Sequence, residues 1–401
     1  MAKLRALLRA AFAVLLASTT PLALAEATTQ AQPIRIGASV SRTGELAQFG
    51  VQVERGLRMW QRDLSDRGSL LGRPVNLELY DDGSDPTRAI EQYLEMRAAG
   101  IDLFVSPYSS PLTLAVRDAL GDADYAMLSI ATAPTIWTDA QSDGEVQTTR
   151  IFGLYTPAQQ NMLPFLQLAA ERGLTSLALV HQDSAFPNAV AAGVRERAGQ
   201  HGLTLVLDAS YPQAAPDFDA LARRLRRTNA QAIVVGSYLD DGRALARAAH
   251  AAGVRAELIA FSGGPALREF ASGLDAAAVN GVISSVQWMR SARLPGSFDF
   301  GFRYRERFEV YPSYDAAGGY AAGQVFEAAI RLAGSDGVRA VREQLGSLKF
   351  RSLLGHYRVD AAGRQIAKRT YLVQWQDQHI SLIFPSYLAR WDVLYPLPWN
   401  R

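Results

Sequence analysis

The stretch Ile34-Arg35-Ile36-Gly37-Ala38-Ser39-Val40 decides the fold, because its composition and length predict a buried strand. Val53, Leu57, Trp60 and Leu64 follow at helical spacing, so a helix is expected after this strand. Further apolar runs, separated by helical patterns, lie at residues 74–79, 102–105 and 126–130, and in a second series at 151–154, 176–180, 203–207, 232–235, 257–261 and 282–286. Strands that alternate with helices form parallel sheets covered by helices, and two such series predict two α/β lobes.

Several later elements are also predicted. Ser84-Asp85-Pro86 combines an acidic N-cap with proline at the first helical position, which indicates the start of a helix. The remaining predicted elements are a helix over residues 157–172, a long helix through 321–332, and paired strands at 371–375 and 379–384 before a proline-rich tail.

The composition is that of a globular protein. Of the 401 residues 48% are apolar and 20% are charged, which is enough apolar material for two domains and excludes a disordered chain or a coiled coil. The net charge is +2, but Lys3, Arg5 and Arg9 supply a local excess, and the sequence from Glu26 onward is one unit negative. Nucleic acid and anionic membranes bind to a clustered basic face, so a near-neutral body argues against either of them as a partner.

The first 25 residues have the three parts of a cleavable secretory signal. A basic start precedes an apolar run at 10–17, and Ala23-Leu24-Ala25 forms a small-residue cleavage site ahead of Glu26. The apolar run is too short to span a bilayer, which takes about 20 residues. The sequence has no cysteine, which excludes a disulfide and a lipidated cysteine. We therefore expect a signal peptide at residues 1–25 and a mature protein exported to the periplasm.

Hydroxyl-bearing and aromatic residues gather directly after the predicted strands, where open α/β sheets bind ligands. Ser110 precedes Pro111 and is expected to cap a helix, so that free backbone N–H groups and the hydroxyls of Ser109 and Ser110 converge on a site for a carboxylate. Thr132 adds a hydroxyl from the next strand end. The candidate ligand-binding residues are Tyr108, Ser109, Ser110, Ala131, Thr132, Tyr155, Asp183, Phe186, Tyr238 and Gly263. Each also fits a structural role, since N-cap serines and buried aromatic residues occur throughout α/β proteins.

The sequence lacks the spacings that mark catalytic, metal and nucleotide sites. Its five histidines are scattered, and none stands in an H-E-x-x-H spacing or beside a nucleophile motif. Neither G-x-G-x-x-G nor G-x-x-x-x-G-K-[ST] occurs. Asp81, Asp82 and Asp85 imitate a metal-binding cluster but are interpreted as a strand end and a helix cap. We therefore expect no metal, no cofactor and no catalytic residue, and the chain is not expected to be an enzyme.

Short motifs follow one another in a fixed order from Ile34 to the tail. They are Ser41-Arg42-Thr43-Gly44, Leu71-Gly72-Arg73-Pro74-Val75, Tyr80-Asp81-Asp82, Ser106-Pro107-Tyr108-Ser109-Ser110, Asp183-Ser184-Ala185-Phe186-Pro187, Asp217-Phe218, and Tyr314 with Gly318-Gly319-Tyr320-Ala321-Ala322. Together they make the sequence similar to the periplasmic solute-binding proteins of leucine/isoleucine/valine-type ABC transporters. The resemblance covers nearly the whole chain after residue 33.

This resemblance implies a type I periplasmic-binding-protein fold, with two Rossmann-like lobes, parallel-sheet cores and three hinge crossovers. Lobe 1 would comprise residues 33–152 and 286–370, and lobe 2 residues 153–285 and 371–401. It also implies a monomer that closes on a branched-chain or other hydrophobic amino acid, or a related small carboxylate, and delivers it to an ABC permease of the inner membrane. A sensory protein that signals to a membrane receptor would have the same pocket and stays open as an alternative.

The resemblance also assigns roles to individual residues. Ser109, Ser110, Ala131 and Thr132 match the positions that hold the α-carboxylate of the ligand. Aromatic positions of the second lobe are matched by Phe186 and Tyr238.

The sequence departs from the family at the site of the ligand's ammonium group. Branched-chain amino-acid binders carry a glutamate there, after the strand that corresponds to residues 257–261, whereas this chain has Ser262-Gly263-Gly264. Asp183, Asp240 and Asp241 are candidate replacements. If none serves, the expected ligand is an aromatic or aliphatic carboxylate without an amino group, because burying an unpaired ammonium costs several kcal/mol.

Overall fold

All the apolar runs predicted as strands form strands in the computed structural model, which describes residues 32–138 and 149–400. The predicted signal peptide at residues 1–25 lies outside the described residues. The described elements belong to one compact unit that begins at Pro33. Strand boundaries differ from the predicted ones by a few residues, mainly because strands of the second series run on toward their carboxyl ends.

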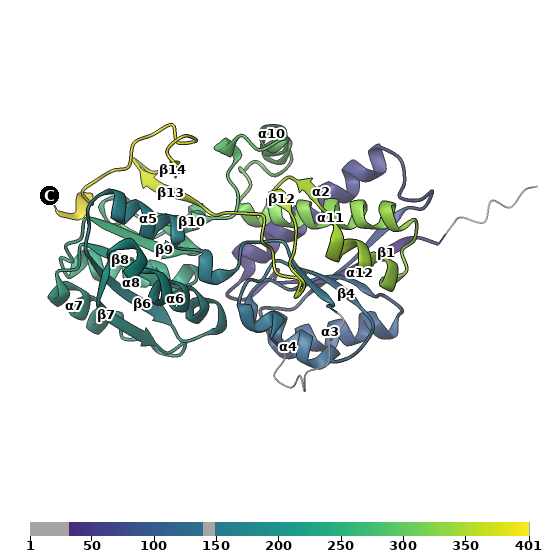
Figure 1. Cartoon of the computed structure of the whole chain (residues 1–401), viewed down its shortest axis with the longest axis horizontal. Coiled ribbons are helices and arrows are strands. Elements are labelled where there is room, and N and C mark those ends of the chain that lie inside the picture. The colour runs from purple at the N-terminus through teal and green to yellow at the C-terminus, as the bar shows by residue number, and fades with distance from the viewer. Residues whose placement is uncertain (1–31, 139–148, 401) are drawn as a thin grey trace, which may run out of the picture. The chain divides into compact units, whose positions relative to one another are not determined.

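The first sheet has five parallel strands in the order β2-β1-β3-β4-β5 (Figure 1). Its strands are β1 (Ile34–Val40), β2 (Val75–Asp81), β3 (Leu103–Val105), β4 (Ala126–Ser129) and β5 (Ile151–Gly153). Strand β1 is almost wholly buried, as expected for a parallel strand between two layers of helices. The strand order reverses between β1 and β3, and ligands of open α/β sheets bind beside such a reversal.

The second sheet has seven strands in the order β14-β13-β10-β9-β8-β6-β7. Its strands are β6 (Ser176–Gln182), β7 (Thr204–Tyr211), β8 (Ala232–Gly236), β9 (Leu258–Ser262), β10 (Ile283–Val286), β13 (Tyr371–Gln376) and β14 (His379–Phe384). The strands from β6 to β10 are parallel and repeat the order of the first sheet, whereas β13 runs antiparallel to both β10 and β14. The predicted α/β fold with two parallel-core sheets is therefore confirmed.

Helices cover both faces of the sheets (Figure 1). The α-helices are α2 (Ala47–Asp66), α3 (Pro86–Ala98), α4 (Ser110–Leu120), α5 (Leu163–Glu171), α6 (Ala185–Arg197), α7 (Phe218–Thr228), α8 (Leu239–Ala251), α9 (Ala276–Val279), α10 (Ser297–Phe308), α11 (Tyr314–Ala333) and α12 (Val338–Ser347). Short 3₁₀ helices and a hairpin complete the fold: η1 (Pro134–Trp137), η2 (Ala158–Gln160), η3 (Gly199–His201), η4 (Gly264–Ala266), η5 (Arg268–Ala271), η6 (Arg290–Ala292), η7 (Pro398–Asn400), β11 (Phe350–Ser352) and β12 (Gly355–Tyr357).

Helix α11 returns to the first sheet although it follows β10 of the second sheet in the sequence. It packs along α2, and two glycines allow the close approach. A Cβ at Gly56 would lie 2.0 Å from the carbonyl oxygen of Ala316, and a Cβ at Gly319 would lie 2.1 Å from that of Val53. Helix α12 contacts β4, after which β13 rejoins the second sheet. The chain therefore passes between the two sets of elements after β5, after β10 and before β13.

The helix predicted over residues 157–172 is wrong in its first half. The structure has η2 there, followed by a separate helix, α5, with a break at Asn161 and Met162. Pro164 lies in the first turn of α5, where its missing N–H costs nothing. At the break, the carbonyl oxygen of Asn161 accepts a hydrogen bond from Thr370 Oγ1 at 3.2 Å. A partner distant in the sequence thus stabilises the break.

The proline-rich tail packs across the second sheet. The backbone N–H of Leu394 donates to Gln374 Oε1 at 2.8 Å, and Gln376 Nε2 donates to the carbonyl oxygen of Asp392 at 2.7 Å. Farther along, the N–H of Leu397 donates to the carbonyl oxygen of Glu257 at 2.9 Å. The tail is not paired with a strand, so these bonds supply partners for its backbone N–H and C=O groups.

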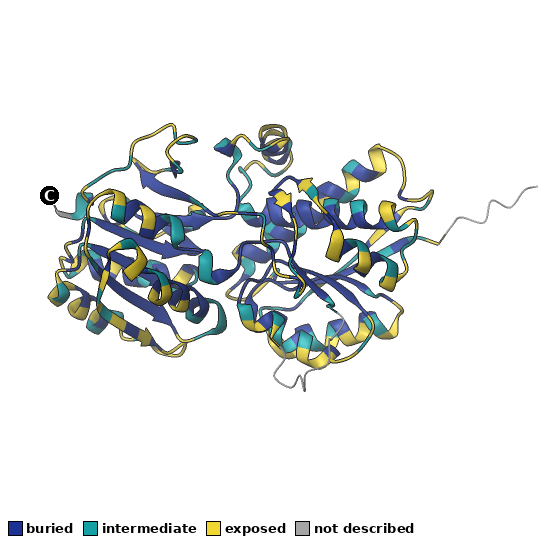
Figure 2. Cartoon of the chain, in the orientation of Figure 1, coloured by how far each residue is buried: buried dark blue, intermediate teal, exposed yellow. Residues whose placement is uncertain are grey.

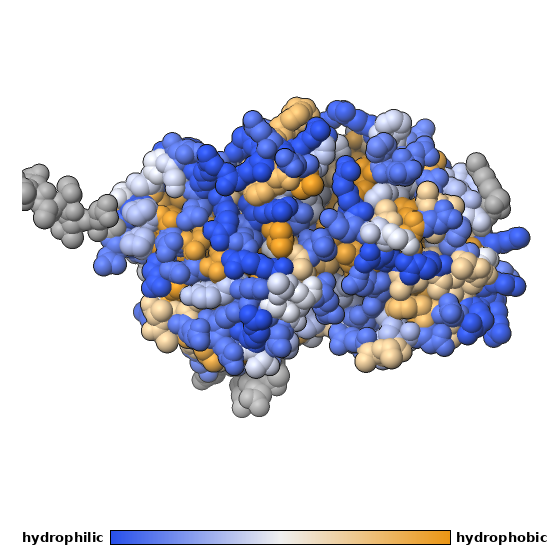
Figure 3. Space-filling model, turned by 180° about the vertical axis from the view of Figure 1, so that it is seen from behind, coloured by the Kyte–Doolittle hydropathy of each residue, from blue (hydrophilic) through white to orange (hydrophobic). Residues whose placement is uncertain are grey.

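Most strand residues are buried, and the exposed residues lie mainly on the outer faces of the helices and in the loops (Figure 2). On the face shown in Figure 3 hydrophilic residues predominate, and apolar residues appear in scattered groups. Among the residues that the structure describes, no helix has the length and apolar character to cross a bilayer.

Candidate functional site

One cavity receives residues from both sheets. The space between its walls is about 510 Å³, part of it open to solvent. The lining residues are Tyr108, Ser109, Ser110, Ile130, Ala131, Thr132, Tyr155, Asn161, Phe186, Tyr238, Gly263, Ser285, Gln287 and Tyr314. Nine of the ten residues predicted from the sequence are among them, and Asp183 is the exception.

The position of the cavity follows from the topology of the sheets. On the first sheet its residues come directly after β3, β4 and β5. On the second sheet they come after β6, β8 and β9 and from the end of β10. Parallel strands end at the same edge of a sheet, so the loops that follow them meet at one place.

Ser109, and not Ser110, is the N-cap of α4, so the predicted cap is wrong by one residue. Ser109 has a positive φ of 90°, and its Oγ accepts the N–H of Leu112 at 3.4 Å. Ser110 is the first helical residue, and Pro111 fits the second position because an N–H is not needed there. The oxygen of the Ser109 hydroxyl therefore accepts a bond within the helix cap, and its proton stays available.

The hydroxyl of Ser110 instead joins the ends of β3 and β4. Its Oγ accepts the backbone N–H of Ala133 at 3.1 Å and that of Thr132 at 3.4 Å. Both bonds use the oxygen as acceptor, so the hydroxyl proton stays available to a group in the cavity. In the described part of the chain, the hydroxyl of Thr132 meets no protein partner and is a further available donor.

Aromatic rings form the rest of the wall. Tyr108 stacks on Phe49 at a centroid distance of 4.6 Å and an interplanar angle of 6°. Tyr155 and Tyr314 meet edge to face at 5.8 Å, and Phe186 lies 5.7 Å from Tyr238. Such walls suit a flat or branched apolar body.

The tyrosine hydroxyls are neutral hydrogen-bond donors. Burial, together with the charge of Asp315, raises the pKa of Tyr155 well above its usual value, and burial likewise raises the pKa of Tyr108 and Tyr314. Burial and the carboxylate of Glu45 raise the pKa of Tyr238. The Tyr155 hydroxyl donates to the carbonyl oxygen of Tyr314 at 3.2 Å, whereas the Tyr238 hydroxyl is buried with no partner among the described residues.

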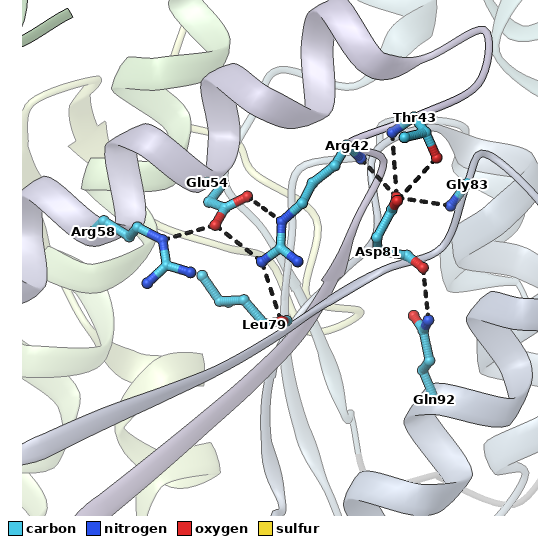
Figure 4. A network of polar contacts seen from close by, with 8 residues as sticks. All are labelled: Arg42, Thr43, Glu54, Arg58, Leu79, Asp81, Gly83 and Gln92. Carbon is cyan, nitrogen blue, oxygen red and sulfur yellow. Dashed lines mark hydrogen bonds and ion pairs between the residues drawn. The ribbon is translucent and has the colours of Figure 1, made fainter.

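The loop before Glu45 is fixed by the motifs that were singled out in the sequence (Figure 4). Asp81 accepts the backbone N–H groups of Arg42 and Gly83, each at 2.9 Å. Arg42 also donates to Glu54 of α2 at 2.6 Å. As interpreted from the sequence, Asp85 is a helix cap: its carboxylate accepts the N–H of Thr87 at 2.7 Å.

None of the three aspartates considered for an ammonium group lines the cavity. Asp183 is exposed and accepts a hydrogen bond from Asn188 at 2.9 Å. Asp240 pairs with Arg243 in the first turn of α8, whose N-cap is Tyr238. Asp241 accepts a hydrogen bond from Gln182, and burial raises its pKa. The described lining therefore contains no acidic and no basic side chain.

Two ionisable residues that the sequence argument missed lie behind the wall. Asp315 is fully buried in the first turn of α11; burial raises the pKa of its carboxyl to about 7, although Ser313 Oγ donates to it at 3.1 Å. Lys368 donates to the carbonyl oxygen of the lining residue Gln287. The sequence around Asp315 and around Lys368 gave no signal of this placement.

A family model described as periplasmic binding protein matches residues 33–379. Among curated relatives, the Leu/Ile/Val-binding protein BraC3 of Rhizobium johnstonii is 27% identical over 245 residues, which are 61% of this chain and 65% of BraC3. The aligned part thus spans slightly less than two-thirds of that relative.

Solved structures share the fold at lower identity. The substrate-binding protein LivJ of a branched-chain amino acid transporter from Streptococcus pneumoniae, in complex with isoleucine, has a TM-score of 0.75 at 19% identity, covering 91% of this chain and 100% of LivJ. A solute-binding protein of an ABC transporter from R. palustris, in complex with benzoate, has a TM-score of 0.73 at 17% identity, covering 88% and 95%.

The family match spans most of the chain. The resemblance drawn from the sequence is confirmed, and so is the type I fold. The family is one of extracytoplasmic binding proteins and not of enzymes, as was predicted for this chain. The chain therefore belongs to the periplasmic binding protein family.

Proposed function

We propose that the chain is the substrate-binding protein of an ABC importer and that it holds a small carboxylate in the cavity. The observation that supports this most is the convergence of the strand ends of both sheets on one space lined by hydroxyls and aromatic rings. The named ligands of the relatives are leucine, isoleucine and valine for BraC3, isoleucine for LivJ and benzoate for the R. palustris protein. All of them carry a carboxylate.

The ligand's carboxylate would lie against the ends of β3 and β4. The hydroxyls of Ser110 and Thr132 are the donors, with the backbone of Ala131 beside them. Hydrogen bonds to a charged acceptor are roughly twice as strong as those between neutral groups, so two such donors suffice to orient the ligand.

The body of the ligand would lie among Tyr108, Tyr155, Phe186 and Tyr238. An amino-acid ligand would also bury an ammonium group, and the described lining offers it no carboxylate. An unpaired buried ammonium is strongly disfavoured. An aromatic or aliphatic carboxylate without an amino group therefore fits this cavity better than a hydrophobic amino acid.

The two sheets would be the cores of two hinged lobes, residues 33–152 with 286–370 and residues 153–285 with 371–401. The passages after β5, after β10 and before β13 would be the three hinge crossovers. A monomer would close on the ligand because the closed form offers contacts from both lobes, and would release the ligand unaltered to the permease.

The periplasm is the proposed location, reached with a cleavable signal peptide at residues 1–25. Expression in a bacterium followed by amino-terminal sequencing of the periplasmic fraction tests this. A first residue of Glu26 is the expected result, and retention of Met1 would contradict it.

A ligand screen tests the function. The chain from Glu26 would be melted in the presence of benzoate, phenylacetate, 4-hydroxybenzoate, L-leucine, L-isoleucine and L-phenylalanine, and the binders titrated by calorimetry. A ligand that binds only the folded state raises the melting temperature by mass action, and we expect this for at least one carboxylate without an amino group. Binding by no carboxylate at millimolar concentration, or chemical alteration of the bound one, would contradict the proposal.

A further inference from the structure

The three passages between the sheets meet in one hydrogen-bonded cluster behind the cavity. Gln287, directly after β10, accepts the N–H of Thr156 on its Oε1 at 3.0 Å and donates from Nε2 to the Thr156 carbonyl oxygen at 3.4 Å. Lys368, from the passage before β13, donates to the carbonyl oxygen of Gln287. Asn161 accepts hydrogen bonds from Ser285 Oγ at 2.5 Å and from Thr370.

Lys368 is the one cationic member of this cluster. It is 8% exposed, and within the described ranges it forms no ion pair with an acid. A buried lysine without an anion is costly, and burial lowers its pKa to about 7. The protonation state of this amine therefore changes when a new charge is placed near it.

A ligand carboxylate would be such a charge. The cavity is lined by neutral side chains, and Lys368 donates to the carbonyl oxygen of the lining residue Gln287, so Gln287 is the layer between the cavity and the amine. In surroundings of low polarity, opposite charges attract much more strongly than they do in water.

We propose that Lys368 is a positioning residue that balances the charge of a bound carboxylate through the Gln287 layer and selects anionic over zwitterionic ligands. This rests on the proposed function, because it assumes that the cavity binds a carboxylate. An ammonium group on the ligand would cancel the attraction that the lysine supplies.

The proposal has a consequence for protons. Without ligand, Lys368 is mostly neutral at pH 8 and mostly charged at pH 6. A buried anion favours the charged amine, so its pKa rises on binding, and the protein takes up a proton when it binds the ligand above pH 7. From a starting pKa of about 7, the uptake is at most about 0.9 proton at pH 8 and about 0.1 at pH 6.

Other titratable groups lie around the cluster, and the experiment has to distinguish their protons from that of Lys368. Tyr155, Tyr314 and Tyr371 are kept neutral by burial, which raises the pKa of each, and Arg369 points to the exposed side. Asp315 titrates in the same pH range, and a bound anion would raise its pKa too. An experiment must therefore separate Lys368 from Asp315.

Calorimetric titration makes this separation. Benzoate and phenylacetate serve as anionic probes and L-phenylalanine as the zwitterionic one, each titrated at pH 6 and pH 8 in buffers of different ionisation enthalpy. The proton count would be compared among the wild type, Lys368→Met, Asp315→Asn and the double variant. Methionine keeps the length of the buried stem without an amine.

We expect the anions to bind more tightly than L-phenylalanine, with proton uptake at pH 8 that is nearly absent at pH 6. Asp315→Asn, which has no titrating carboxyl at this position, keeps the uptake at pH 8, and adding Lys368→Met to it abolishes the uptake. Lys368→Met also binds the anions about tenfold or more weakly at pH 6. If circular dichroism shows that Lys368→Met does not fold, the wild type and Asp315→Asn decide the matter.

Equal uptake at both pH values in Asp315→Asn, uptake that persists when Lys368→Met is added to Asp315→Asn, or uptake that disappears in Asp315→Asn would each overturn the proposal. Tighter binding of L-phenylalanine would overturn it while leaving the proposed function intact. Binding of no probe and of no member of the wider carboxylate screen would instead remove the proposed function itself.

Discussion

The Ser110 hydroxyl has two roles at the wall of the cavity. It accepts the backbone N–H groups of Ala133 and Thr132, which ties the start of α4 to the end of β4, and it keeps a proton for a ligand. This arrangement orients the hydroxyl before any ligand arrives. A ligand that binds to preorganised donors loses less free energy to the ordering of side chains than one that binds to mobile donors.

Ser110→Ala is expected to weaken carboxylate binding by about tenfold or more. The change removes one hydrogen-bond donor to the ligand. It also leaves two buried N–H groups without an acceptor, which lowers the folding stability by about 1–3 kcal/mol. Thr113→Ala is the matched control: Thr113 Oγ1 donates to the Ser109 carbonyl oxygen at 2.9 Å on the same helix but does not line the cavity. Calorimetric titration of both variants checks the difference, and equal affinity in Ser110→Ala and the wild type would remove Ser110 from the site.

Asp315 should make the stability of the ligand-free protein depend on pH. Its Oδ1 is buried without a partner among the described residues, and burial raises the pKa of the carboxyl from 3.8 to about 7. Between these values the folded state binds more protons than the unfolded state, so stability falls as the pH rises through this window. Above pH 7 the cost is complete, and at most it is about 4 kcal/mol.

Asp315→Asn cannot ionise and should therefore gain stability over the wild type between pH 4.5 and pH 8. Urea unfolding at the two pH values measures the gain. Asp118→Asn, which removes an exposed carboxylate that pairs with Arg117, should differ from the wild type by a small and nearly constant amount. A difference between Asp315→Asn and the wild type that does not change with pH would show that Asp315 is ionised in the same way in both states.

At the scale of elements, α11 links the core to the cavity through two adjacent glycines. A Cβ at Gly319 would press on the backbone of α2, 2.1 Å from the Val53 carbonyl oxygen, whereas a Cβ at Gly318 would lie 1.9 Å from the Tyr155 hydroxyl. Backbone in a packed helix cannot give way easily, but the end of a side chain can.

Gly319→Ala is therefore expected to destabilise the fold by about 1–3 kcal/mol. Gly318→Ala should instead displace Tyr155 from the cavity wall and lower ligand affinity, with a smaller loss of stability. Gly346→Ala is the control in α12: its Cβ would meet Phe152 at 3.7 Å, an ordinary contact, and alanine favours a helix. Chemical unfolding and ligand titration separate the two effects, and an equal loss of stability in both α11 variants would contradict the assignment.

Strands such as β1 could be predicted because a buried parallel strand carries its own apolar signal. The carboxyl ends of those strands then indicated where the cavity residues would gather. Local signals did not reveal the break at Asn161, because the partner that stabilises it is Thr370, far along the chain. The same reason hid Lys368, which stands beside the exposed Arg369 in the passage before β13 and bonds to the distant Gln287.

At the scale of the whole molecule, the same three passages that connect the two sheets also back the ligand cavity. Gln287 both lines the cavity and carries the hydrogen bonds that join Thr156 and Lys368. A ligand that presses on Gln287 thus acts on every connection between the proposed lobes. Binding and hinge motion would then share one set of contacts, as closure around a ligand requires.

The most direct test is a crystal structure of the protein with the tightest-binding carboxylate of the screen. We expect the ligand between the two sheets, chemically unchanged, with its carboxylate oxygens within hydrogen-bond distance of the Ser110 and Thr132 hydroxyls and its body against Tyr155 and Phe186. A carboxylate bound elsewhere, or bound in the cavity with its charged end turned away from Ser110 and Thr132, would contradict this.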